Sequence, residues 1–269
     1  MKNIPKWQRK FYGILSLNWK GTKQQYRIIN RSIRILAILI IPLALTIHTV
    51  TSWLFATTFR VGWDSTNFGP YFVSGAFMVG AASVITGMYV LRNHYSLEKY
   101  ITNKHFDSMG KLLVLLSLIY FYFNVNEYLI TGYKMKNVEG EHLMELFSGR
   151  FAPMFWLVQI FGMMVPILVL LFKKGRKPIP IFVISICVVV GAWFKRFLIV
   201  TPTLMHPFIP MQNIPVSWTH YIPTWEECAV TAGSLAGALL VITFLIRIFP
   251  IIPIWEIAQE KGLLKNIES

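Results

Sequence analysis

Hydrophobic residues gather in six long runs along this chain, and shorter polar connections separate the runs. Each run approaches the roughly 20 apolar residues that an α-helix needs to cross about 30 Å of hydrocarbon. The pattern predicts an all-α polytopic membrane protein with six transmembrane helices. The expected spans are residues 33–56, 71–91, 112–132, 152–172, 179–200 and 228–249.

The segments outside the spans differ in character at the two ends. Residues 1–32 form a basic lead-in to the 33–249 transmembrane domain, and residues 250–269 form a tail. Aromatic residues alternate with basic ones in the lead-in, which favours a segment lying on the membrane surface. A disordered basic tail is the alternative there. The aromatic residues are Trp7, Phe11, Tyr12 and Trp19.

Composition agrees with a membrane protein, because 55% of the residues are hydrophobic and only 14% are charged. The net charge of +14 comes mainly from the lead-in, the second and fourth connections and the tail. Since Lys and Arg concentrate on the cytoplasmic side of membrane proteins, both termini are expected in the cytoplasm, against anionic lipid. These charges flank spans in short loops, so nucleic acid is not an expected partner.

Cysteine and histidine patterns argue against a cofactor bound by this chain alone. Cys187 and Cys228 are expected at different depths, and no CxxC or CxxCH motif occurs. An iron–sulfur centre or c-type haem would therefore belong to another polypeptide. Zinc ligation by His206 and His220 is a weak alternative, because the usual additional ligands and spacing are missing.

The third span carries a polar stripe. Its polar residues recur at spacings of three and four, which places them on one face of a helix. They are Ser117, Tyr120, Asn124, Glu127 and Thr131. Glu127 is expected roughly 8 Å to the outer side of the span's middle, at a rise of 1.5 Å per residue. It then either faces a hydrated pocket or reaches up to water from the helix end.

Three cationic or ionisable residues are expected at a similar depth. Arg196 falls level with Glu127, and an ion pair between them would offset the cost of burying each charge. Lys195 points about 100° away, and either cation can instead reach the interface. His48 in the first span is either a proton-exchanging group beside this pair or a hydrogen-bonded packing residue.

Longer stretches of the sequence resemble a known family. The run PLALTIHTVTSWLFATTFRVGWDSTNFGPYFVSGAFMVGAASVITG at 42–87 resembles the second helical bundle of the polysulfide reductase, or NrfD-like, membrane subunits. YFYFNVNEYLITGY at 120–133 is similar to the next helix of that family. WFKRFLIVTPTL, YIPTWEE and FPIIPIWE resemble the closing part of the quinol-oxidising membrane subunits of alternative complex III.

The resemblance implies a four-helix bundle plus two further helices in a bacterial cytoplasmic membrane. It also implies a respiratory complex with iron–sulfur and c-haem subunits, and quinone or quinol at an interface with a partner. Two departures matter. Lys195 stands where similar proteins often have an acidic residue, and the chain resembles only the second half of longer relatives. The resemblance therefore implies a split subunit whose partner supplies the first bundle.

The resulting hypothesis is a membrane subunit of a quinone-linked electron-transfer complex. The polar residues would form a proton path or lie close to quinone, namely His48, Ser117, Tyr120, Asn124, Glu127, Thr131 and Arg196. None of them is assigned a catalytic role, and whether the chain counts as an enzyme stays open. The alternatives are a purely structural membrane anchor and a secondary transporter, although the paired helix breaks typical of a transporter are not evident.

Overall fold

The computed structural model describes residues 5–17, 19–58, 60–206, 213, 215, 221–249 and 251. Within that part of the chain every regular element is helical. Six helical segments there are long and apolar enough to cross a membrane, one for each of the six predicted spans. The expectation of an all-α polytopic membrane protein is confirmed. The segments are Lys23–Ala56, Phe68–His94, Asn103–Lys134, Ala152–Leu171, Pro178–Met205 and Trp225–Ile248.

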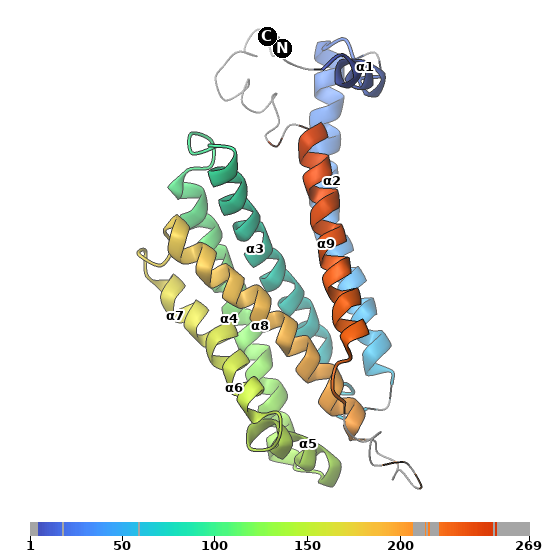
Figure 1. Ribbon diagram of the computed structural model, residues 1–269, viewed down its shortest axis with the longest axis vertical. Helices are drawn as coiled ribbons and strands as arrows, with labels where there is room; N and C mark the ends of the chain where they lie inside the picture. Colours follow the sequence, from blue (N-terminus) through green and yellow to red (C-terminus); the bar gives the residue numbers. More distant parts are fainter. Residues whose placement is uncertain are drawn as a thin grey trace. The chain divides into compact units, whose positions relative to one another are not determined.

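By contact the chain separates into two compact units, Leu43–Tyr221 and a second unit made of Met1–Pro42 with Ile222–Ser269. The first unit contains a four-helix bundle of α3 (Phe68–His94), α4 (Asn103–Lys134), the fourth span and α8 (Pro178–Met205) (Figure 1). A short helix, α5 (Asn137–Phe147), packs against α4, the start of the fourth span and α8.

The bundle core is formed by apolar faces of these helices. Phe106 and Leu113 on α4 are fully buried, and so are Ile181 and Val188 on α8. Burying apolar side chains of this size stabilises a fold in water by about 1.5–3 kcal/mol each. In a membrane the same contacts gain mainly from close packing, because lipid is as apolar as the core.

The fourth span is irregular in the middle. It consists of α6 (Ala152–Gln159), a π-helical turn η1 (Ile160–Met164) and α7 (Val165–Leu171). Pro166 follows the turn and has no N–H to donate to the helix, which removes one constraint on regular winding. At the turn Gly162 packs directly on Gly191 of α8, where an added Cβ on Gly191 would lie 2.6 Å from Gly162 Cα. The two backbones approach closely because both residues lack side chains.

The connection before α3 is tied to the bundle. The Trp63 indole N–H donates to the carbonyl of Ile199 on α8 at 3.0 Å. The Asn67 amide donates to the carbonyl of Phe123 on α4 at 2.8 Å. Gly62 adopts φ of +78°, a left-handed conformation that glycine adopts at little cost. The connection therefore lies over the end of the bundle between α4 and α8.

The other unit holds α1 (Lys6–Leu15), the first part of α2 (Lys23–Ala56) and α9 (Trp225–Ile248). Gln8 of α1 donates to the carbonyl of Ile248 at 3.1 Å, and the Tyr12 hydroxyl donates to the same oxygen. These bonds use a carbonyl that a helix end leaves unsatisfied. The predicted surface position of the lead-in, and the domain limits at 32/33 and 249/250, stay predictions. Nearly all of the 250–269 tail lies outside the described residues.

Candidate functional site

The carboxyl group of Glu127 lies at the centre of a polar cluster. It accepts hydrogen bonds from the Ser65 hydroxyl, at 2.9 Å to Oε2 and 3.2 Å to Oε1, and from the Asn67 amide at 3.0 Å. Both donors come from the connection before α3, and Glu127 itself is 9% exposed. Neutral donors thus hold this carboxyl group without cancelling a charge on it.

A second set of hydrogen bonds continues along α4 toward the fourth span. The Tyr120 hydroxyl donates to the Tyr71 hydroxyl at 3.1 Å, and Tyr71 donates to the Asn124 amide oxygen at 3.1 Å. The Asn124 amide N–H in turn donates to Gln159 at 3.0 Å. The Tyr71 and Tyr120 rings stack with centroids 5.0 Å apart. Polar groups from three helices therefore satisfy one another inside the bundle, as buried polar groups require.

Lys195 brings a cation next to these groups. Its ammonium group donates to the Tyr128 hydroxyl and lies 4.7 Å from the centroid of the Tyr128 ring. It is also 5.8 Å from the ring of Tyr71 and 5.5 Å from that of Phe155. Aromatic faces attract a cation, most strongly where water is excluded. Lys195 is 4% exposed, so these rings supply most of its surroundings.

The predicted stripe lies on the inward side of α4. Ser117, Tyr120, Asn124 and Glu127 are buried, and Thr131 is half-buried. The Thr131 hydroxyl donates to the Glu127 backbone carbonyl at 2.9 Å. The Ser117 hydroxyl oxygen has no hydrogen-bond partner among the described residues.

The predicted ion pair between Glu127 and Arg196 is not formed among the described residues. Arg196 is exposed, and its guanidinium lies 4.9 Å from the centroid of the Phe72 ring. The reason lies in the rotation of α8. Its buried residues Val188, Gly191, Lys195 and Leu198 follow at spacings of three, four and three, as one helix face does. The Gly191 contact fixes this face inward, so Lys195 is buried and Arg196 points about 100° away.

His48 lies apart from the Glu127 cluster. Its ring is half-buried and meets Phe77 edge to face with centroids 6.5 Å apart. Over the described residues no hydrogen bond joins His48 to Glu127 or to the stripe. Counting residues along the helices predicts a similar depth for His48 and Glu127, but their side chains are not bonded to each other in the described part of the chain.

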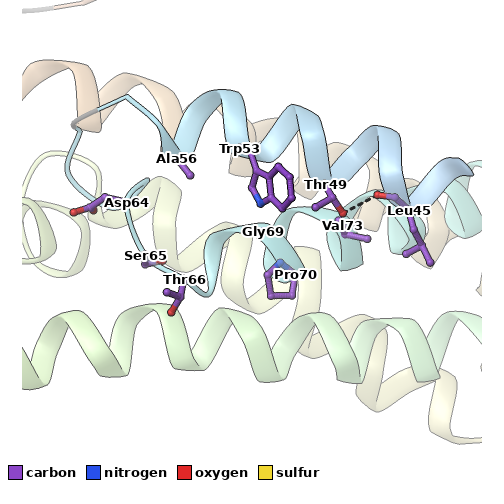
Figure 2. Close-up of a pocket in the computed structure, with 10 residues that line it drawn as sticks. All are labelled: Leu45, Thr49, Trp53, Ala56, Asp64, Ser65, Thr66, Gly69, Pro70 and Val73. Carbon is purple, nitrogen blue, oxygen red and sulfur yellow. Dashed lines mark hydrogen bonds between the residues drawn. The ribbon is translucent and has the colours of Figure 1, made fainter. Parts of the chain in front are cut away.

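An open groove lies beside the cluster (Figure 2). It has a volume of about 590 Å³ and runs between the second half of α2 on one side and the connection and first turns of α3 on the other. Most of its wall is apolar, with Asp64, Ser65 and Thr66 near one end. Ligand-binding clefts commonly have volumes of about 300–1,000 Å³ with a few polar groups. The lining residues are Leu45, Thr49, Trp53, Ala56, Asp64, Ser65, Thr66, Gly69, Pro70 and Val73.

Metal binding is not indicated in the described part of the chain, where no three His, Cys, Asp or Glu side chains are grouped to hold an ion. His206 pairs with Glu145 at 2.9 Å instead. His220, its proposed companion in zinc binding, lies outside the described residues.

Sequence reasoning missed most partners of the stripe, namely Ser65, Asn67, Tyr71 and Gln159. It also missed Tyr128, the partner of Lys195. Gln159 gave a usable signal, because a lone amide in an apolar span needs a hydrogen-bond partner. Tyr71 lies near a predicted membrane boundary, where tyrosine is common without any polar role. The connection residues gave no periodic signal, since their positions depend on how the loop folds over the bundle.

Two comparisons with known proteins bear on this site. The family described as "Polysulphide reductase, NrfD" matches residues 10–207. The chain is also similar to the "Menaquinone reductase, integral membrane subunit" of Nitratidesulfovibrio vulgaris, with 24% identity over 149 residues. That alignment covers 54% of this chain and 35% of the relative. The matched part is thus about a third of the relative's length.

Proposed function

Because this chain belongs to the NrfD polysulphide reductase family, we propose that it is a membrane subunit of a quinone-linked respiratory electron-transfer complex. In this proposal a quinol or quinone headgroup contacts the groove, and the Glu127 cluster exchanges protons with it. The name of the menaquinone reductase relative supports the substrate class. The finer resemblance to alternative complex III is part of the proposal.

The observation that carries the proposal is the double position of Ser65. Its side chain lies in the lining of the groove, and its hydroxyl donates to the Glu127 carboxyl group at 2.9 Å. A molecule in the groove is therefore one hydroxyl away from a buried ionisable group. Intramembrane carboxyl groups in such settings commonly serve proton transfer.

The chemistry places a defined demand on these residues. Oxidation of a quinol to a quinone releases two protons and two electrons. The electrons pass to a redox centre on another subunit, since this chain is expected to bind none of its own. The protons need acceptors near the headgroup, and Ser65 can pass a proton to Glu127 by accepting one bond while donating another.

Substitution of Ser65 tests the proposal. Ser65→Ala removes the link between the groove and Glu127, and we expect quinol-linked turnover of the purified complex to fall while its subunits still assemble. Thr66→Ala is the matched control, because Thr66 also lines the groove but is not bonded to Glu127. Equal turnover in the two variants would contradict the proposal.

Labelling tests the location of the headgroup. A photoreactive azidoquinone should attach to peptides within residues 45–73 of the complex, and excess quinone should prevent the attachment. A substitution that fills the groove, Gly69→Leu, should reduce labelling. Labelling confined to other subunits would place quinone elsewhere.

The proposal includes partner subunits. A chain supplying a first helical bundle, and subunits carrying iron–sulfur clusters and c-haem, would complete the complex in a bacterial cytoplasmic membrane. Support comes from α2 and α9, because the described part of the chain buries no residue in their most apolar stretches. In a membrane such faces meet lipid or other helices. Copurification of a second polytopic subunit with a tagged copy of this chain tests the split arrangement.

A structural anchor is the second candidate, and a specific observation favours it. The Glu127, Asn124 and Tyr71 side chains satisfy one another or are bonded to neighbours, as in a network that only specifies packing. In that case Ser65→Ala and Glu127→Gln would change stability in detergent and leave turnover unchanged.

A further inference from the structure

A small, partly open cavity lies beside Glu127, at the end of the bundle that α5 covers. Its volume is about 50 Å³. Its lining includes Glu127 and Thr131 of α4, His142 of α5 and Thr203 of α8. The connection before α3 also contributes Gly62 and Trp63. The cavity thus joins the Glu127 cluster to the end of the bundle that α5 covers.

This cavity is suited to water. A water molecule needs roughly 10–15 Å³ of such space and two to four polar partners. The volume accommodates about three waters by that measure. Hydroxyl, carboxyl and imidazole groups in the lining supply the partners. An apolar cavity of this size would stay dry, whereas this one offers hydrogen bonds.

His142 gives an independent sign of water. Its side chain is 8% exposed, and its Nδ1 atom has no hydrogen-bond partner among the described residues. A buried polar atom left unpaired destabilises a fold, so such atoms are usually bonded to protein or ordered water. A water in the cavity is the partner that the geometry offers.

Two further ionisable side chains, His206 and Glu145, lie next to His142 and are closer to the surface. The His142 and His206 rings meet edge to face with centroids 5.6 Å apart. His206 Nε2 lies 2.9 Å from Glu145 Oε2, an ion-pair distance without the alignment of a hydrogen bond. Both side chains are partly exposed, at 20% and 23%. Glu127 and His142 are both buried, and this pair is the more exposed part of the series.

The hydrogen bond at His206 Nδ1 limits how the ring can meet Glu145. His206 Nδ1 lies 2.8 Å from the Pro202 carbonyl oxygen, which only accepts, so Nδ1 must donate. A neutral ring would then present a bare Nε2 to the carboxylate oxygen, and two acceptors repel at that distance. One proton on either atom removes the repulsion.

We propose that water in this cavity bridges Glu127 to His142 and makes His142 a proton-exchanging group between the Glu127 cluster and solvent at the α5 end. This inference rests on the proposed function, in which the Glu127 cluster exchanges protons with a quinol or quinone headgroup and therefore needs a route to solvent. His142 takes a proton at Nδ1 from the water and gives one up at Nε2, so the ring ends neutral as the other tautomer. The ionisable groups that face it are Glu127, Tyr71 and Tyr128 across the cavity, and Glu145 and His206 beside it.

Electrostatics agree with this role. Burial, and to a lesser extent the neighbouring His206, lowers the pKa of His142 to about 4. The ring is therefore neutral at pH 7 and available to accept a proton. An imidazole that held a proton permanently would not exchange one.

Solid-state NMR of the full chain in lipid bilayers tests the inference without quinol. Histidine, glutamate and leucine carry isotope labels, and magnetisation is transferred from water to each site. We expect the His142 ring nitrogens and the Glu127 carboxyl carbon to gain signal as fast as the exposed His94 and His105 rings. His142→Gln and Glu127→Gln assign the two signals.

A cavity-filling variant provides the matched comparison. Thr131→Ile places an apolar group in the cavity and should abolish the fast water transfer to both sites, whereas Thr131→Ser keeps the hydroxyl and should preserve it. Signals that grow as slowly in the wild type as the buried Leu113 amide would overturn the inference. Fast transfer that survives Thr131→Ile would overturn it too. Because quinol is absent, either outcome is independent of the Ser65 turnover test.

Discussion

The two ends of the four-helix bundle treat charge in different ways. At the end where α7 meets α8, Arg176 pairs with Asp107 at 2.7 Å and donates to the carbonyls of Leu170 and Leu171. Lys111 lies 2.6 Å from the same carboxylate. At the other end Glu127 is held by neutral donors, and Lys195 contacts a phenol and aromatic rings. The first end neutralises its charges in contact, whereas at the second end Glu127 and Lys195 form no ion pair with each other among the described residues.

The difference separates architecture from chemistry. An ion pair in contact fixes two helices and has little reason to exchange protons. Separated ionisable groups joined by hydroxyls can change their protonation state without breaking the packing. The Asp107–Arg176 end therefore has the features of a structural contact, which we call the clamp. The Glu127 end has the features of a functional site where protons can be exchanged.

The largest effect is expected from Glu127→Gln. Removing a group that exchanges protons in a reaction typically costs about 100-fold or more in rate, so quinol-linked turnover should fall by about that factor. The amide keeps the acceptor for Ser65 and Asn67, so assembly should persist. Glu98→Gln, at an exposed carboxylate between α3 and α4, is the control and should not alter turnover. Normal turnover in Glu127→Gln would contradict the claim that the Glu127 end of the bundle takes part in proton exchange.

The second prediction concerns pH and His142. Its folded pKa of about 4 lies below the usual 6.5, so the unfolded chain binds the proton more tightly between these values. Stability from this group is complete above about pH 6.5 and is lost as pH falls toward 4, by at most about 3 kcal/mol. Chemical unfolding of the purified chain at pH 7 and pH 4.5 measures the loss.

His142→Leu supplies the comparison for that measurement. It should be less sensitive to acid between pH 7 and 4.5, while Arg176→Met should keep the wild-type pH dependence. An unchanged pH dependence in His142→Leu would show that His142 is not kept neutral by burial.

Arg176→Met is expected to have a moderate effect on stability alone. The variant loses the contacts with Asp107 and the two carbonyls, so its unfolding temperature in detergent should fall by several degrees. Turnover per assembled complex should equal that of the wild type. A loss of turnover in the assembled variant would give the clamp a chemical role.

The smallest effect is expected from His48→Ala. The His48 ring meets Phe77 and lies apart from the Glu127 hydrogen bonds, so turnover should decrease far less than in Glu127→Gln. Parallel turnover assays of the two variants measure the ratio. An equal loss of turnover in the two variants would support the sequence-based prediction that His48 belongs to the proton path.

Sequence patterns predicted the helices well and the site in part. Long apolar runs are a direct physical requirement of a bilayer, so all six spans were predictable. The spacing of the stripe also predicted that Glu127, Asn124 and Tyr120 share a face. The depth of a residue, counted along the helix from the sequence, does not determine how α8 is rotated about its own axis. The Gly162–Gly191 contact decides that Lys195 rather than Arg196 faces inward, and no count along one helix contains that information.

The partners of Glu127 were beyond prediction for a related reason. Ser65 and Asn67 belong to a connection whose path depends on Trp63 and Gly62 and on two carbonyls of other helices. Loops have no period from which side-chain directions follow. His142 was missed because α5 is short and its burial arises from packing against other helices.

The π turn at Ile160–Met164 has a consequence for insertions and deletions in this chain. A π turn holds one residue more than an α-helical turn would over the same length. Deleting Phe161 would let the fourth span wind as a continuous α-helix, and the parts before and after the turn would keep their faces. A one-residue deletion without such a turn to absorb it would rotate everything before it by about 100°. Gln159 would stay beside Asn124 in the first case and would leave it in the second. The spacing of this helix, as much as its composition, therefore specifies the site.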